Sequence, residues 1–315
     1  MKKLNTLLVI ICAAGLLCGS LKVYYSIENN KYNIEMKKLQ DTGELKIKII
    51  ADIEQKTIEK NGNSIHYFVS GNKTGETIVF LHPAFGDHRC FDRQIDFFSH
   101  DFCVITVDML GHGLTGTGKS SGDISETAAH IADILAQEKI ENAHIVGVSL
   151  GSLLAQDFAL KYSEKVLSLT ALGGYNINKE QKEVAKAQQK EMFKWLFKMI
   201  FSMDAFRRYT ASVTLIDKVE QVHFYESAKL FTRKSFTVMT GLDKLIANRS
   251  IQRNYPLLIL SGEKDTELAV KSAEQWHIDE AESQMQIIEN AGHCANMDNS
   301  TRFNEILMKF LIDKK

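Results

Sequence analysis

Short apolar runs alternate with longer helix-like runs from residue 54 to the end of the chain. The first two runs, 57–60 and 64–70, flank Asn61-Gly62, a dipeptide that favours a tight hairpin between antiparallel strands. Further strand-like runs occupy 76–81, 102–107, 143–146, 166–172, 257–260 and 285–288, and helix-like runs occupy 125–138, 152–162, 271–276 and 301–312. This order predicts an α/β fold with an eight-stranded, mostly parallel sheet flanked by helices.

The alternation stops between the sixth and seventh predicted strands. Residues 176–253 are rich in Lys, Phe and Met, most densely at 191–201, where Trp195 lies. We expect a helical lid of four or five helices here. Its Phe and Met side chains suit either packing within the lid or an adaptable apolar cleft, and Trp195 is a candidate pocket residue.

The first part of the chain has a different pattern. Residues 6–21 carry no charge and lie between Lys3 and Lys22, a length near that of a signal-peptide core or a short membrane span. We expect a signal-anchor or a cleaved signal peptide at 1–25. The rest of the protein is then anchored outside the cytoplasmic membrane, or secreted, although the lysines that follow residue 21 weaken this orientation.

The predicted organisation has five parts. They are the signal segment 1–25, a membrane-proximal spacer 26–53, the first part of the core 54–175, the helical lid 176–253 and the second part of the core 254–315. About 260 residues after position 53 suffice for one α/β domain with an insertion.

Composition excludes several classes of function. The chain has 315 residues, 44% of them hydrophobic, and a net charge of −1, which predicts no nucleic-acid partner. Its five cysteines are scattered, so we expect neither a disulfide framework nor a metal site. The oligomeric state is not predictable from these features.

The first candidate catalytic motif is the segment 147–151, which has the sequence Gly-Val-Ser-Leu-Gly and lies between a predicted strand and a predicted helix. A serine between two glycines at such a junction is typical of a nucleophile elbow, in which bulk at Gly147 or Gly151 would collide with the backbone. We predict Ser149 as nucleophile. The Leu150 amide at the helix N-terminus is predicted to donate to an oxyanion.

A serine nucleophile needs a base and a group that orients the base. Asp265 lies in the loop after the seventh predicted strand, and His293 lies in the loop after the eighth. Because the carboxyl ends of parallel strands meet at one crevice, we predict His293 as general base and Asp265 as its orienting acid. Glu263, two positions earlier, is a rival acid.

The loop after the third predicted strand begins His82-Pro83-Ala84-Phe85. We predict the Ala84 amide as the second oxyanion donor, with Phe85 as the rival, since Pro83 has no N–H. His82 and Phe85 are also candidate pocket residues.

With these stretches and the segment 108–113, the chain resembles the α/β-hydrolase fold superfamily, in the branch of small serine esterases and lipase-like hydrolases with a helical lid. In that family the 108–113 loop is structural, so Asp108 and His112 are interpreted as scaffold residues. Pro83 departs from the glycine that the family usually has there, and it stiffens the loop and restricts His82 to extended conformations. Family branches that cleave haloalkanes and epoxides have Asp at the elbow, and Ser149 argues against those reactions.

The resemblance implies hydrolysis of an ester of a small, partly apolar substrate, with no cofactor. Lactone, amide and carbon–carbon bonds stay open, because the same residues serve them all. Two further alternatives are a non-catalytic binding or sensor protein, and a cofactor-free peroxidase or acyltransferase that uses the same triad.

Overall fold

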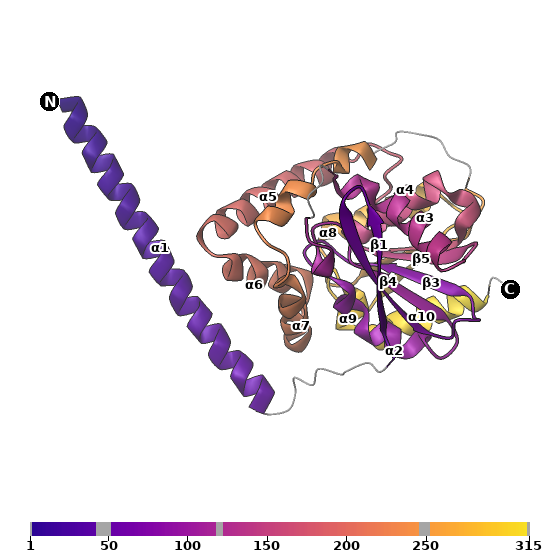
Figure 1. Cartoon of the computed structure of the whole chain (residues 1–315). Coiled ribbons are helices and arrows are strands. Elements are labelled where there is room, and N and C mark those ends of the chain that lie inside the picture. Colours follow the sequence, from indigo (N-terminus) through magenta and orange to yellow (C-terminus); the bar gives the residue numbers. More distant parts are fainter. Residues whose placement is uncertain (1, 42–51, 118–121, 246–252, 314–315) are drawn as a thin grey trace.

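The fold is a single mixed sheet covered by helices on both faces (Figure 1). The computed structural model describes residues 2–41, 52–117, 122–245 and 253–313, with side chains from residue 19 onward. The strands are β1 (Glu54–Lys60), β2 (Asn63–Gly71), β3 (Thr77–Leu81), β4 (Cys103–Val107), β5 (Ala143–Val148), β6 (Val166–Leu172), β7 (Leu257–Gly262) and β8 (Gln284–Ile288). They lie in the order β1-β2-β4-β3-β5-β6-β7-β8.

Only the first two pairings of the sheet are antiparallel. Strand β1 pairs antiparallel with β2 through the turn at Asn61-Gly62, and β2 pairs antiparallel with β4, whereas every other neighbouring pair is parallel. The predicted fold class, eight strands in a mostly parallel sheet flanked by helices, is therefore confirmed.

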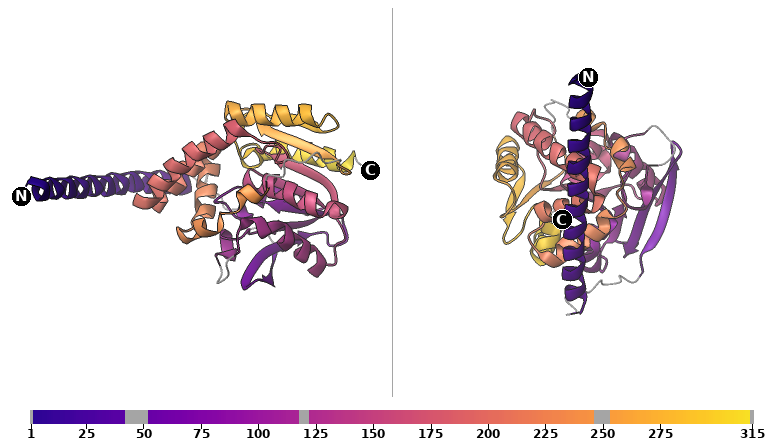
Figure 2. Two further views of the ribbon diagram at one scale, coloured as in Figure 1. Left: turned by 90° about the horizontal axis from the view of Figure 1, so that it is seen from above. Right: turned by 90° about the vertical axis from the view of Figure 1, so that its left-hand side faces the viewer.

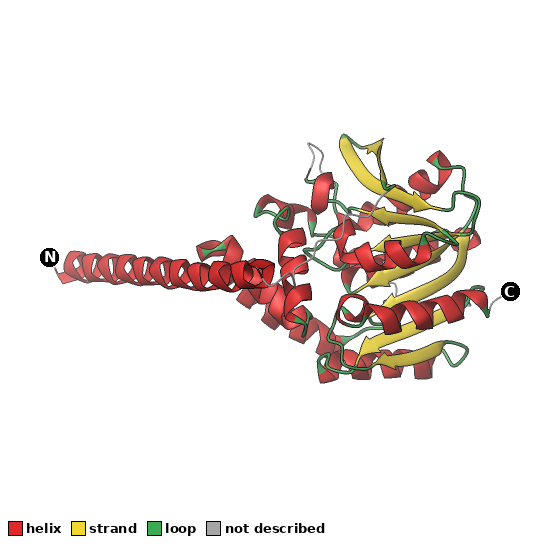
Figure 3. Ribbon diagram, turned by 90° about the horizontal axis from the view of Figure 1, so that it is seen from below, coloured by secondary structure: helices red, strands yellow, loops and turns green. Residues whose placement is uncertain are grey.

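Helices cover both faces of the sheet, which explains why the central strands read as continuous apolar runs (Figure 3). On one face pack α3 (Thr127–Gln137), α4 (Leu150–Lys161) and α8 (Glu267–Asp279), through residues such as Ile131, Phe158 and Trp276. On the other face pack α2 (Asp92–Phe98), α9 (Ala295–Asp298) and α10 (Ser300–Ile312). Short 3-10 helices occupy His88–Phe91 (η1), Gly113–Thr115 (η2), Ile124–Glu126 (η3) and Ser163–Lys165 (η4).

The insertion between β6 and β7 is helical, as the loss of strand alternation predicts. Its described part contains α5 (Lys182–Phe201), α6 (Met203–Thr214) and α7 (Lys218–Ala228), followed by the 3-10 helices η5 (Lys234–Val238) and η6 (Leu242–Leu245). Ser202 caps α6 by accepting the Ala205 N–H, and Asp217 caps α7 by accepting two N–H groups of its first turn. Whether this insertion acts as a lid stays a prediction.

One long helix, α1 (Lys2–Asp41), precedes the sheet and extends away from it (Figure 2). It runs without a break across the boundary predicted at residues 25 and 26, and it packs against α5 and α6 of the insertion. Tyr25 is buried, and the ring of Tyr32 lies 4.9 Å from that of Tyr225 on α7.

No helix within the described part of the chain combines the length and the hydropathy that crossing a membrane requires. Most side chains of residues 1–25 lie outside the described residues, and the signal-anchor or signal peptide expected there stays a prediction. The predicted localisation and domain boundaries stay predictions.

Candidate active site

The segment 147–151 forms a sharp turn between β5 and α4. Ser149 lies at its apex with φ 53° and ψ −115°, a conformation that L-residues rarely adopt, and its N–H donates to the Leu172 carbonyl over 2.8 Å. A Cβ atom at Gly147 would collide with the Gly151 carbonyl, and one at Gly151 would collide with that of Leu81. Both glycines are therefore sterically required, and the turn lifts the Ser149 side chain beyond the strand end.

The structure brings together the three side chains that the sequence places in three separate loops. The Ser149 hydroxyl lies 2.8 Å from Nε2 of His293, and Nδ1 of His293 lies 2.7 Å from Oδ2 of Asp265. The Asp265 side chain is 3% exposed and that of His293 is 26% exposed. An Nδ1–H that donates to this carboxylate leaves Nε2 free to accept the serine proton, which is the tautomer that general-base chemistry needs.

Electrostatics at His293 follow from the same contacts. Burial of the ring disfavours the imidazolium, but the charge of Asp265 and its hydrogen bond outweigh that effect, so the pKa of His293 is raised above its ordinary 6.5. Asp265 thus stabilises the protonated state that the base enters when it removes a proton.

Glu263, the rival acid, lies on the outside of the same loop. Its Oε2 accepts the Asn290 N–H over 3.0 Å, and its other carboxylate oxygen lies 3.4 Å from the Lys264 ammonium. Its side chain is exposed and makes no hydrogen bond to His293. The structure therefore associates Asp265, and not Glu263, with the imidazole.

The predicted oxyanion donor Ala84 and its rival Phe85 lie in the loop after β3. Among the described residues, the N–H groups of Ala84 and Phe85 donate no hydrogen bond, and Leu150 is the first residue of α4, whose early N–H groups lack helical acceptors. A hydrogen bond of 3.2 Å from the Gly86 N–H to the Pro83 carbonyl closes the turn. The assignment of Ala84 and Leu150 as the donors stays a prediction.

Phe85 has φ 71°, which is unusual for a residue with a Cβ. Its ring is 4% exposed and lies with its centroid 5.0 Å from each of the rings of Trp195, Phe206 and Phe231. We call these four residues and Phe236 the aromatic cluster. Edge-to-face contacts of this kind are favourable, so the insertion holds Phe85 in a strained backbone conformation.

Two of the predicted pocket residues, Phe85 and Trp195, therefore touch each other at the loop after β3. The third, His82, is fully buried: its Nε2 accepts the Met109 N–H over 3.1 Å, and its Nδ1 lies 2.8 Å from the Pro83 carbonyl. Burial lowers the pKa of His82, which keeps the ring neutral. His82 therefore anchors the loop through these hydrogen bonds, and its place in a substrate pocket stays a prediction.

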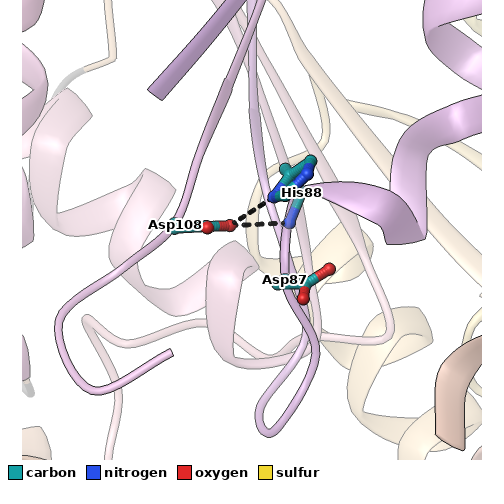
Figure 4. A group of neighbouring side chains, drawn as sticks. All are labelled: Asp87, His88 and Asp108. Carbon is teal, nitrogen blue, oxygen red and sulfur yellow. Dashed lines mark hydrogen bonds and ion pairs between the residues drawn. The ribbon is translucent and has the colours of Figure 1, made fainter. Parts of the chain in front are cut away.

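Asp108 fixes the other end of this loop (Figure 4). Its fully buried carboxylate accepts hydrogen bonds from the N–H and Nδ1 of His88, over 2.8 and 2.9 Å, and from the Leu114 N–H over 2.8 Å. Asp87, Asp108 and His88 offer possible metal-ligand atoms within 4.8 Å of one another, but Asp87 already pairs with Arg89. These bonds account for the cluster as a structural link between two loops, in agreement with the scaffold role predicted for Asp108.

Cys294 follows the candidate base in the sequence and is completely buried. Burial raises the pKa of its thiol well above the ordinary value, which disfavours the nucleophilic thiolate.

Comparisons with known proteins identify the family and the fold. Residues 76–300 match the model of the alpha/beta hydrolase fold family. A 2-hydroxy-6-oxononadienedioate/2-hydroxy-6-oxononatrienedioate hydrolase from Paraburkholderia phymatum is 26% identical over 280 residues, which cover 78% of this chain and 90% of that protein.

Two solved structures illustrate the likeness in fold. A carboxylesterase from Nitrososphaera gargenis has a TM-score of 0.67 at 19% identity, covering 83% of this chain and 98% of its own. A 2-hydroxy-6-oxo-6-phenylhexa-2,4-dienoate hydrolase from Rhodococcus has a TM-score of 0.65 at 18% identity, covering 82% and 98%.

Proposed function

The chain belongs to the alpha/beta hydrolase fold family, and we propose that it is a serine hydrolase which cleaves a carboxylic ester through an acyl-enzyme intermediate. Its relatives include hydrolases, which supports hydrolysis as the general activity. The observation that carries the finer proposal is the hydrogen-bonded series Ser149, His293 and Asp265.

The proposed reaction starts when the Ser149 oxygen attacks the substrate carbonyl carbon while Nε2 of His293 takes the hydroxyl proton. The N–H groups of Ala84 and Leu150 then stabilise the oxyanion, and each such donor contributes about 3 kcal/mol to lowering the barrier. His293 passes its proton to the leaving alcohol, and a water molecule activated by the same imidazole releases the acid. All steps use groups of this chain, so the proposal requires no cofactor.

The aromatic cluster supports a substrate with an apolar part. Phe85 belongs both to this cluster and to the oxyanion loop, so an apolar group bound beside its ring lies near the predicted reacting carbonyl. The name of the Paraburkholderia relative favours a second candidate, hydrolysis of an oxo-dienoate of that type.

A panel of p-nitrophenyl esters from acetate to dodecanoate, with 2-hydroxy-6-oxonona-2,4-dienedioate assayed in parallel, tests the proposal. We expect ester turnover whose kcat/KM rises with acyl length up to a medium chain, because each buried methylene contributes about 0.8 kcal/mol. Turnover of the dienedioate without turnover of any ester would favour the second candidate and contradict ester specificity.

The raised pKa of His293 predicts the pH dependence. The base works only in its neutral form, so kcat/KM should fall about tenfold per pH unit below a pKa that lies above 6.5, and should reach a plateau above it. Asp265→Asn removes the charge that raises this pKa, so the residual kcat/KM of the variant should begin to fall at a lower pH than that of wild type. Initial rates between pH 5 and about 9 give the pH below which kcat/KM falls in wild type and in the variant. If kcat/KM of wild type does not begin to fall at a higher pH than that of the variant, the assignment is contradicted.

A further inference from the structure

An exposed row of large apolar side chains runs along α5 of the insertion. Its members are 45–63% exposed and are Met192, Phe193, Leu196, Phe197 and Ile200. Their spacing of i, i+1, i+4, i+5 and i+8 places them on one side of the helix. We call these five residues the α5 stripe. Contiguous apolar surface of this kind on a soluble domain marks a place where something binds.

Other residues of α5 attach the helix to the rest of the insertion. Trp195 and Met199 pack against the aromatic cluster. Glu191 accepts a hydrogen bond from the Tyr209 hydroxyl over 2.8 Å, and the Lys198 ammonium lies 4.7 Å from the centre of the Tyr209 ring. These contacts determine which side of α5 faces the protein, and they leave the α5 stripe directed outward.

Lysines border the α5 stripe. The helix contains five lysines against two glutamates, although the whole chain has a net charge of −1. Lys190 and Lys194 are exposed and precede Phe193 and Phe197 by three residues, so each lysine is a surface neighbour of a stripe residue. A lysine at such an edge can lay its methylene groups along apolar surface while its ammonium extends toward an anion.

Helix α1 adds exposed apolar side chains at the same end of the molecule. Val23, Tyr24 and Ile27 are 52–60% exposed. Tyr24 lines the same small cavity as Lys198, so this part of α1 lies beside the C-terminal end of α5. Figure 2 shows both helices at the end of the molecule that is remote from the sheet.

We propose that α5 binds the surface of an anionic lipid bilayer, with the α5 stripe toward the acyl chains and Lys190 and Lys194 beside the phosphate groups. Helices with Phe, Leu and Ile on one side and lysines next to them are typical of segments that lie in the plane of a membrane surface. Charge complementarity favours lipid over a second copy of this chain. In a symmetric dimer the facing surface is the same patch, with the same excess of lysines, whereas lipid phosphates are negative.

Fluorescence quenching by lipids with brominated acyl chains tests the proposal in full-length Phe193→Trp. We expect brominated phosphatidylglycerol vesicles to quench the introduced indole. Brominated phosphatidylcholine, or about 0.5 M salt, should greatly weaken this quenching, because both reduce the attraction of the lysines. The unmodified chain gives the background from Trp195 and Trp276. Phe97→Trp, at an exposed position on α2, is the matched control and should show no quenching.

The contribution of charge is tested in the Phe193→Trp background. Lys190→Gln combined with Lys194→Gln should raise the phosphatidylglycerol concentration for half-maximal quenching about 30-fold at low ionic strength, since each lysine near an anionic surface contributes about fivefold. Lys73→Gln combined with Lys309→Gln makes the same change of charge at two exposed positions outside the insertion and should leave the concentration unchanged.

Leu196→Glu in the same background should abolish quenching, while the melting temperature stays close to that of wild type because the side chain is exposed. Absence of quenching in Phe193→Trp, equal quenching by the two lipids, or equal effects of the two lysine pairs would overturn the proposal. A dimer that Leu196→Glu dissociates, without quenching by lipid, would assign the α5 stripe to a second copy instead. Quenching at position 193 reports contact by α5 itself, so the result depends neither on residues 1–25 nor on the ester activity.

Discussion

Replacing Ser149 with alanine is expected to lower kcat/KM for a p-nitrophenyl ester about 10⁶-fold, with substrate binding changed far less. The hydroxyl is the only group that the proposal assigns to forming the covalent bond. Without it, His293 has no proton to remove, and only the oxyanion donors and substrate positioning remain. The melting temperature should change little, because alanine keeps the Cβ atom and loses a single hydrogen bond.

Ser125→Ala is the matched control, since it removes a serine hydroxyl that donates to Asp123 and that the proposed reaction does not use. A fluorophosphonate probe should label wild type and Ser125→Ala at Ser149, and should leave Ser149→Ala unlabelled. Retained activity in Ser149→Ala would eliminate the assignment. Failure to label folded wild-type protein would favour the binding or sensor alternative.

The same assay separates hydrolysis from the peroxidase or acyltransferase alternative. If hydrogen peroxide or a thiol outcompetes water for the acyl group at millimolar concentration, the acceptor is not water and the hydrolase assignment fails.

Asp265→Asn is expected to lower kcat about 10⁴-fold, the second largest effect. An asparagine keeps the size of the side chain but can present an N–H to Nδ1 of His293, which favours the tautomer whose Nε2 carries the proton and cannot accept one from Ser149. The variant also loses the charge that stabilises the imidazolium. Both effects act on the transition state, so kcat should fall more than KM changes.

Glu263→Gln gives the decisive contrast, because Glu263 lies two positions away and was the rival acid. Its amide oxygen can still accept the Asn290 N–H, and the site is exposed, so kcat should stay within about twofold of wild type. Comparable losses in both variants would mean that the loop conformation, and not the acid beside His293, determines activity.

Most of the sheet was predictable because its periodicity is local. The eight predicted strands differ from the observed ones by a few residues at most, since fully buried strands such as β3 and β4 read as unbroken apolar runs. The short helix α2 was not predicted, as seven residues after an irregular loop provide little periodicity. Helix α8 was predicted too short, although Thr266 caps it five residues before the predicted start.

The site was predictable to a similar degree and for a related reason. Ser149, Asp265 and His293 each follow a strand of a parallel sheet, so topology alone directs them to one edge. The partners of Phe85 were not predictable, because Phe206, Phe231 and Phe236 come from a segment whose packing depends on long-range contacts. The enrichment of Phe in 176–253 indicated an apolar surface without indicating which rings would meet.

The backbone of Phe85 limits how position 85 can vary during evolution. Glycine would relax a φ of 71° but would leave a void among four aromatic rings, whereas any smaller apolar side chain would keep the unfavourable dihedral and lose the contacts that offset it. No single replacement both relieves the backbone dihedral and keeps the aromatic contacts. A lineage that alters the substrate cleft therefore has an easier route through the rings contributed by the insertion than through the loop residue on which they converge.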